Sequence, residues 1–377
     1  MTSQDRLSWL LAGAGAAGLV AAAVASPADA AAAAAQDWSP FVLVTGLLLI
    51  GLVANDDGLF AAAGYQLARV ARSGAGLFAG AAVMVGLATA TLNLDTSVAF
   101  LTPVLVYTAR SRGGGEAPLL YGCLLLSNAG SLFLVGSNLT NLIVLGHLHL
   151  SGAEFLARMW APALAALVVT AVVVAAFEHC ELRVSAGDLE PPQRPVIGVG
   201  LIAVVLATLL VVTLRSPAVP VAIAGAAVAG FRLVRGKIEV GKVAAVVGVP
   251  ALAGLFGVAV ALGTLGRLWS GPAVLLAHLD LWGTAAVAAA SSVLVNNLPA
   301  ASLLAARTPG HPFALLIGLN LGPNLFVTGS LAWLLWLRAA RDTGAEPSVA
   351  KASRIGAVAV PLSMAAALTV LALTGSS

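Results

Sequence analysis

Four clusters of short polar residues interrupt segments of this chain that are otherwise strongly apolar. Two lie at expected hairpin tips and read LNLDTS (92–97) and VNNLP (295–299). The others read SNAGS and GSNLTN (127–141), and NLGPN and TGS (320–330). Gly and Pro free backbone amides and carbonyls, which a membrane tolerates only beside protein or a water-filled cavity. The pattern predicts a binding site for an anionic or oxygen-rich ligand.

All four clusters are expected to contribute substrate-binding residues. These are Asn93, Thr96, Asn128, Ser137, Asn138, Thr140, Asn141, Asn296, Asn297, Asn320, Asn324 and Ser330. The N-termini of half-helices at the breaks would add partial positive charge. The alternative is that these side chains merely bond neighbouring helices to one another. For a single Asn the two interpretations are equally good, but four clusters in related positions favour a site.

Asp95 is the one acidic residue, of 16, that the pattern places deep within a hydrophobic segment. An ionisable group there is energetically expensive and indicates a function. We expect Asp95 to carry a proton or to ligate a coupling cation, H⁺ or Na⁺, so that a transmembrane ion gradient replaces any cofactor. The alternative is an Asp satisfied by backbone amides at a hairpin tip. Asp56 and Asp57 are expected to be solvated charges at a span end.

The elements that position these residues are expected to be membrane helices. Hydrophobic residues make up 60% of the chain and charged residues 9%, whereas a soluble domain carries about 25% charged residues. No basic run with interleaved aromatics occurs, which excludes nucleic acid as a partner. The two cysteines lack metal-ligand spacing. The sequence has no Walker glycine loop, HExxH or GxSxG motif, so we expect no enzyme.

The apolar segments predict an all-α integral membrane protein with about nine crossings and two re-entrant hairpins. The hairpins are expected at 76–109 and 281–306, and broken helices at 118–150 and 313–337. With the N-terminus inside, most of the 19 Lys and Arg residues fall on the cytoplasmic side. We therefore expect a multi-pass protein of the inner, cytoplasmic membrane.

The same order of elements occurs twice, which predicts two inverted-topology repeats typical of secondary transporters. Residues 1–40 would form an N-terminal helix, either a signal peptide or an anchor, and an Ala-rich linker. The first repeat would span 41–186 and the second 244–377. A cytoplasmic linker (187–195) and connecting helices (196–243) would lie between them.

The strings LNLDTSVAFLTPV, GSNLTNLIVL, VNNLPA and GLNLGPNLFVTGSLAWLLW resemble bacterial arsenite permeases, the ArsB-type arsenical pump membrane proteins. This family belongs to the ion transporter superfamily, which includes citrate, dicarboxylate and other anion carriers. The resemblance implies export of arsenite or antimonite, as the neutral hydroxide, in exchange for protons. It also implies, as partners, a soluble ATPase subunit in some members and a homodimer in some branches. The positions that carry it over are Asn93, Asp95, 137–141, Asn296, Asn297, Asn320 and Asn324.

Two transport functions therefore remain open from the sequence. The preferred one, which the resemblance implies, is a secondary active transporter that exports arsenite or antimonite in exchange for protons. The absence of Lys and Arg from the four clusters fits a neutral polyhydroxylated substrate. The alternative is a symporter, coupled to Na⁺ or H⁺, for citrate, a dicarboxylate or an inorganic oxyanion. In that case helix ends and a bound cation would supply the positive charge. The expected partners are a small inorganic or carboxylate substrate and membrane lipid.

Overall fold

The computed structural model describes residues 3–146, 148, 150–183 and 198–375, and its regular secondary structure is helical throughout this part of the chain. Six helical segments are long and apolar enough to cross a membrane. They are α1 (Ser3–Ala25), α2 (Pro27–Asp56), α4 (Gly74–Thr91), α8 (Gly152–Phe177), α12 with α13 (Val240–Val247 and Val249–Leu268) and α19 (Val349–Leu373).

Shorter helices fill the space between these segments. Five short apolar segments comprise α6 (Ala117–Gly130), α10 (Val199–Thr213), α11 (Ala218–Val234), α15 (Leu281–Val295), and α17 (Pro312–Leu321) with the 3₁₀ helix η2 (Gly322–Leu325). The remaining elements are α3 (Leu59–Val70), α5 (Leu94–Ser111), η1 (Val135–Ser137), α7 (Leu139–Leu145), α9 (His179–Leu182), α14 (Gly271–Ala277), α16 (Asn297–Leu304) and α18 (Leu331–Asp342).

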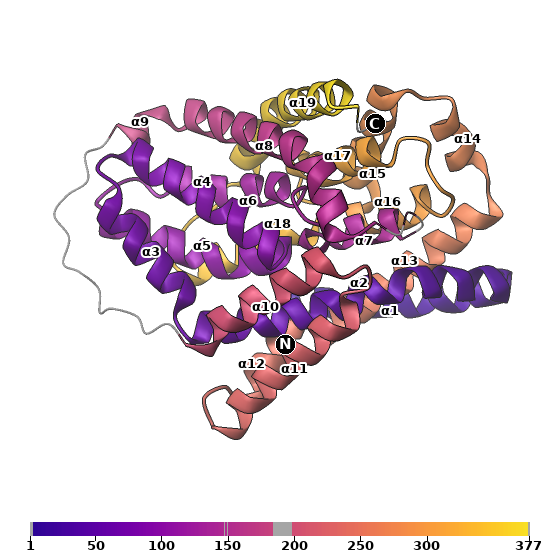
Figure 1. Ribbon diagram of the computed structural model, residues 1–377, viewed down its shortest axis with the longest axis horizontal. Helices are drawn as coiled ribbons and strands as arrows, with labels where there is room; N and C mark the ends of the chain where they lie inside the picture. The colour runs from indigo at the N-terminus through magenta and orange to yellow at the C-terminus, as the bar shows by residue number, and fades with distance from the viewer. Residues whose placement is uncertain (1–2, 147, 149, 184–197, 376–377) are drawn as a thin grey trace.

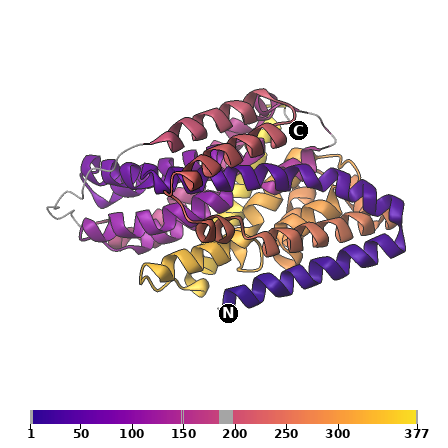
Figure 2. The same ribbon diagram turned by 90° about the horizontal axis from the view of Figure 1, so that it is seen from below.

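The helices are arranged around a centre of short, broken elements. Figure 1 shows α8 and α19 along one edge and α1, α2 and α13 along the opposite edge. The short helices α7, α16 and α18 lie between these edges. Figure 2 shows the same bundle from below, where α1 and α2 join at one end and α13 lies between them. Long helices thus enclose the four interrupted segments.

Helix α1 packs on α13 through glycine residues. A side chain at Gly15 would collide with the backbone of Gly254, and one at Gly257 would collide with the backbone of Gly15. Small residues allow membrane helices to approach until their backbones touch. The outer face of α1 exposes large apolar side chains, including Leu10 and Val24, as expected of a helix that faces lipid on one side.

The expected Ala-rich linker before residue 41 is wrong, because these residues form the first turns of α2. Ser26 caps the helix, its Oγ accepting from the amide of Asp29 at 3.3 Å. Alanine has the highest helix propensity, and Pro27 at the first helical position is favourable. Ala33 is fully buried, so packing stabilises a helix that propensity already favours. The expected linker at 187–195 lies outside the described residues.

The four breaks occur within the segments where the sequence predicts them. Helices α4 and α5 meet at Asn93, and α15 and α16 meet at Asn296. The other two segments are α6–η1–α7 and α17–η2–α18. Their inverted orientation, and the remaining repeat boundaries, stay predictions.

Candidate functional site

The N-termini of α5, α7, α16 and α18 meet at one small cavity of about 20 Å³. The residues that line it come from the start of each helix and from α13: Leu94, Asp95, Asn138, Leu139, Leu252, Leu255, Asn296, Asn297, Leu298, Ser330 and Leu331. A helix N-terminus carries partial positive charge and unpaired amides. The cavity therefore suits an oxygen-rich or anionic ligand, and Asp95 is the one ionisable group in its lining.

Asn93 and Asn296 form the two hairpin tips in the same way. They are the two non-glycine residues of the described chain with positive φ, at 152° and 77°. Asn tolerates such angles better than most residues. Asn93 Oδ1 accepts from the Thr96 amide at 2.7 Å, and Asn296 Oδ1 accepts from the Leu298 amide at 3.4 Å. Each Asn thus permits a sharp turn and caps the helix that follows.

The caps of α7 and α18 bring two further polar groups to the cavity. Asn138 Oδ1 accepts from the Thr140 amide at 3.2 Å. Ser330 is buried, and its Oγ has no hydrogen-bond partner among the described residues. Because a buried polar group is normally paired, this hydroxyl is a candidate ligand contact.

A network of amides centred on Asn320 joins the two broken helices behind the cavity. Asn320 Oδ1 accepts from Ser131 Oγ at 2.5 Å and from Asn138 Nδ2 at 2.8 Å. Its Nδ2 donates to Asn141 Oδ1 at 2.8 Å. One turn away, Asn128 Nδ2 donates to Asn324 Oδ1 at 2.8 Å. Asn128, Asn141 and Asn320 are fully buried, so these side chains fix the helix ends in place.

Two buried tryptophans hold α18 in register with its neighbours. Trp333 Nε1 donates to the Pro323 carbonyl at 2.8 Å, and Trp336 Nε1 donates to the Leu120 carbonyl at 2.8 Å. Both side chains are fully buried, and their rings pack edge to face. They anchor α18 to η2 and α6, which places Ser330 at the cavity.

Asp95 lies in the wall shared by two cavities. The second has a volume of about 250 Å³ and lies between α2, α5, α12 and α18. Arg338 and Asp342 also line it, and Arg338 Nε lies 3.8 Å from Asp342 Oδ2. The Asp95 carboxylate has no hydrogen-bond or ion-pair partner within the described part of the chain. It is therefore available to a ligand in the first cavity and to an ion that enters through the second.

Comparison with known proteins identifies the family. Residues 2–331 match the model of a family described as citrate transporter. The chain belongs to this family. Its members transport solutes across membranes, which makes a non-enzymatic role the expected one for this chain. The resemblance found in the sequence motifs is thereby confirmed.

Similar proteins of known name are arsenical pump membrane proteins. An arsenical pump membrane protein of Escherichia coli is 26% identical over 336 residues, covering 80% of this chain and 78% of that protein. A protein of the same name from Escherichia coli strain K12 is 25% identical over the same shares. The YdaH transporter of Alcanivorax borkumensis has a similar structure, with a TM-score of 0.54 and 16% identity, over 88% of this chain and 84% of that one. The all-α, multi-pass membrane transporter fold is confirmed.

In this citrate transporter family member, the predicted site residues fall into two groups. Asp95, Asn138, Asn296, Asn297 and Ser330 line the cavity. The others surround it: Asn93 caps α5, the amide network holds Asn128, Asn141, Asn320 and Asn324, and Thr96, Ser137 and Thr140 are fully buried nearby. Some of these side chains line a cavity, as a binding site requires, and others bond helices together. Each of the two alternatives drawn from the sequence therefore describes part of the predicted residues.

The expectation that Asp95 is the only deeply placed acid is wrong. Asp37, Asp57 and Glu178 are 1%, 8% and 3% exposed. Asp57 is not a solvated charge, because it pairs with Arg232 and accepts from the Gly200 amide at 2.6 Å. Glu178 pairs with Lys351. Their partners come from distant parts of the chain, so no local pattern shows the burial.

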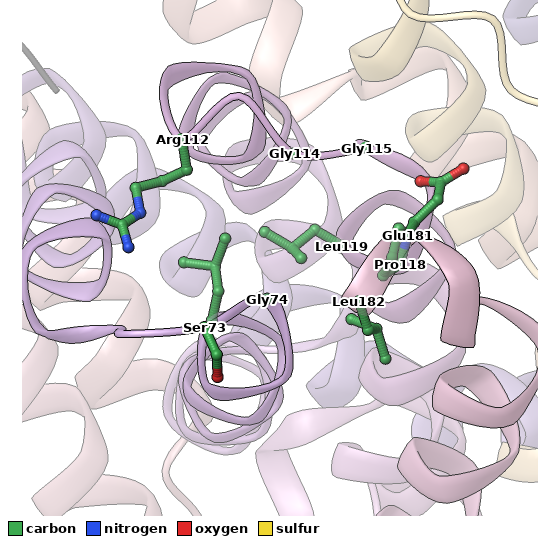
Figure 3. Close-up of a pocket in the computed structure, with 10 residues that line it drawn as sticks. Ser73, Gly74, Arg112, Gly114, Gly115, Pro118, Leu119, Glu181 and Leu182 are labelled. Atoms are coloured by element: carbon green, nitrogen blue, oxygen red, sulfur yellow. The ribbon is translucent and has the colours of Figure 1, made fainter. Parts of the chain in front are cut away.

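A different small cavity lies near α9, away from the converging N-termini. Figure 3 shows Arg112 and Glu181 on opposite sides of it. Arg112 Nη2 donates to the Ala71 carbonyl at 2.6 Å, and Glu181 Oε2 accepts from the Ala117 amide at 3.2 Å. These contacts join loop ends, and none of the predicted site residues lines this cavity.

Sequence reasoning missed Leu252 and Leu255 of α13, which close the central cavity on its apolar side. It also missed Ser131 as a partner of Asn320. Ser131 belongs to a recognised cluster, and its place in the SNAGS string could have indicated a role. The two leucines carry no such signal, because apolar residues are ordinary in a membrane helix.

Proposed function

We propose that the protein is a secondary active transporter of the cytoplasmic membrane that exports arsenite or antimonite in exchange for protons. The observation that carries the proposal is the central cavity, which combines four helix N-termini, neutral amides and one carboxylate. No Lys or Arg lines it, which suits a neutral polyhydroxylated substrate. The name of the Escherichia coli relatives, arsenical pump membrane protein, supports the same substrate.

Asp95 would couple the substrate to the proton by competition. An ionised carboxylate accepts a hydrogen bond from a hydroxyl group of the substrate, whereas a protonated one has lost that acceptor capacity in part. A proton that reaches Asp95 through the larger cavity would therefore weaken substrate binding. Mutual exclusion of substrate and proton is the coupling that exchange requires. The central cavity holds about one water-sized molecule, so the helix ends must separate to admit the substrate.

Cation-coupled uptake of citrate, a dicarboxylate or an inorganic oxyanion is the second candidate, and the four helix N-termini favour it. Here the role of Asp95 is reversed. A bound H⁺ or Na⁺ would neutralise the carboxylate and so allow an anion to enter beside it. The two functions thus predict opposite effects of a neutral residue at position 95 on substrate binding.

Arsenite uptake into everted membrane vesicles, driven by a proton gradient, tests the proposal. The wild type should accumulate arsenite and Asp95→Asn should not. Asp342→Asn is the matched control, because Asp342 also lines the larger cavity but its side chain is 70% exposed. Absence of arsenite uptake by the wild type would overturn the substrate. Citrate binding that no longer needs a cation in Asp95→Asn would support symport.

The vesicle assay also tests the proposed partners. Vesicles washed free of soluble protein and of ATP still hold the membrane protein and the gradient. Uptake under these conditions would mean that a soluble ATPase subunit is not required. Uptake that returns only with ATP and a soluble fraction would support such a subunit. Light scattering of the purified protein in detergent would distinguish a monomer from a homodimer.

A further inference from the structure

Gln36 of α2 contacts α7 and α16, two half-helices whose N-termini line the central cavity, and its neighbour Asp37 contacts α16. Gln36 Nε2 donates to the carbonyls of Ile143 and Ala305, each at 3.2 Å. Ile143 lies in the last turn of α7, and Ala305 is the C-terminal cap of α16. One amide group thus joins the C-terminal ends of the two helices whose N-termini line the cavity.

Arg267 of α13 holds this amide in place. Its Nη2 donates to Gln36 Oε1 at 2.5 Å, and its Nη1 donates to the Gly263 carbonyl at 3.0 Å. Gln36 and Arg267 both line a third cavity, of about 760 Å³, together with Arg215 and Ala306. We call the contacts of Arg267, Gln36, Ile143 and Ala305 the α2 clamp. Leu145 and Gly146 at the end of α7 line the same cavity, so the clamp lies in its wall.

Asp37 faces the protein interior beside the α2 clamp. It is 1% exposed, its Oδ2 accepts from Ser302 Oγ of α16 at 3.2 Å, and its Oδ1 has no partner among the described residues. A buried carboxylate without a paired cation is costly. In the described chain Asp37 is therefore under-satisfied as an ion, and the transport proposal above gives it no role.

The charged groups around Asp37 are few. Arg267 bonds Gln36, the residue that precedes Asp37, and Asp29 lies about two turns earlier in α2. Arg215 lines the same large cavity as Gln36. Helices α7 and α16 present carbonyls and Ser302 here, and α1 carries no charged residue after Arg6. Arg307 donates to the backbone carbonyl of Arg267 at 2.9 Å, whereas Arg267 contacts α2 itself and is the cation that a charge on Asp37 would attract.

We propose that Asp37 is a second proton-binding group, whose charge determines whether Arg267 holds the α2 clamp closed. When Asp37 is protonated, Arg267 bonds Gln36, and α7 and α16 stay joined. When Asp37 loses its proton, the carboxylate attracts Arg267 away from Gln36, and the ends of α7 and α16 are released. The inference rests on the proposed transport function for its meaning, since release would open the cavity from the side opposite to Asp95.

Thiol labelling at Ala306 tests the switch without any substrate. Ala306 is 7% exposed and follows the clamped carbonyl of Ala305, so release should expose it. Ala306→Cys is made in a background with Cys123→Ala and Cys180→Ser. The labelling rate with N-ethylmaleimide is measured in detergent and divided by the rate of the same protein carrying Asp37→Asn. This ratio cancels the pH dependence of the thiol itself.

Because burial disfavours the charged form of the Asp37 carboxyl group, the ratio should be close to one near pH 5 and rise severalfold by about pH 8. Asp342→Asn is the matched control, an exposed acid beside Arg338 in α18 whose removal should leave the rise in place. A ratio that is constant over this range would overturn the proposal. Failure of arsenite transport would not affect this measurement, so the two proposals fail separately.

Ser302→Ala provides a second test if the Asp37→Asn protein is not recovered from membranes. Within the described part of the chain, Ser302 donates the one hydrogen bond to the Asp37 carboxylate. A hydrogen bond to a charged group stabilises the charged form, so its removal should move the labelling rise to higher pH by about one unit. The rate is compared with that of the Ala306→Cys protein alone. An unmoved rise would contradict the proposal.

Discussion

The two hairpin tips turn the chain in a similar way but carry different side chains. Asn93 and Asn296 both turn the chain at positive φ and cap the next helix. After the first tip comes Asp95, which lies between two cavities. After the second comes Asn297, whose backbone N–H donates to the Gly329 carbonyl at 2.8 Å. The first tip thus presents a titratable group, whereas the second is fastened to the loop that precedes α18.

This comparison separates shape from charge. A repeated Asn–turn–helix arrangement builds a symmetric cavity, and one asymmetric carboxylate gives it a coupling group. Asn93 Nδ2 is buried without a partner in the described chain, while Asn296 Nδ2 donates to the Thr328 carbonyl at 3.2 Å. The first tip is therefore less constrained by its neighbours than the second.

Moving the acid from one tip to the other should have the largest effect. Asp95→Asn combined with Asn297→Asp keeps the number of carboxylates but places the acid where the larger cavity does not reach. We expect no proton-driven uptake, equal to vesicles without the protein. Substantial uptake by this double variant would show that either tip serves, and the comparison would fail.

Removal of the Asn320 side chain should cause the next largest effect. Asn320→Ala leaves Ser131, Asn138 and Asn141 without a shared partner, and unpaired buried groups cost about 1–3 kcal/mol each. We expect the free energy of unfolding to fall by roughly 3 kcal/mol in total, seen as a lower melting temperature in detergent. The matched control is Thr369→Ala, whose exposed hydroxyl bonds only its own helix.

Glycine at each tip should separate backbone strain from side-chain function. Gly adopts positive φ without strain, and replacement of an Asn helix cap by Gly costs only a few tenths of a kcal/mol. Asn93→Gly and Asn296→Gly should therefore both fold with nearly unchanged melting temperatures. We expect Asn93→Gly to lower the transport rate more, because Asn93 Nδ2 has no partner in the described chain and Asn93 lies two residues before Asp95. Equal losses in the uptake assay would argue that the tips have one function.

The smallest effect on transport is expected away from both tips, at the contact of α1 with α13. Gly254→Val would force the helices apart, because a side chain there meets the backbone of Leu11. We expect a lower melting temperature, while the pH dependence of uptake stays unchanged. Gly13→Val is the matched control, since its position in α1 has open space around it. Similar melting temperatures for the two variants would contradict the packing argument.

Local chemistry explains which features the sequence could predict. Gly, Pro and Asn within apolar segments interrupt a helix wherever they occur, so the breaks at Asn93 and Asn296 followed from composition. The start of α2 did not follow, because an Ala-rich stretch suits either a linker or a helix and only packing decides. Which Asn residues line the cavity depends on pairs such as Asn141 with Asn320, which lie far apart in the chain. Such pairs leave no trace in a local pattern.

The glycine contact between α1 and α13 has a consequence for biosynthesis. Helix α1 leaves the ribosome long before its partner surface around Gly254 and Gly257 is made. Until then its glycine face is covered by lipid or by the insertion machinery. Nascent chains that stop before α13 would keep this face open, and membrane proteases that inspect unassembled helices would have a surface by which to distinguish them from finished protein.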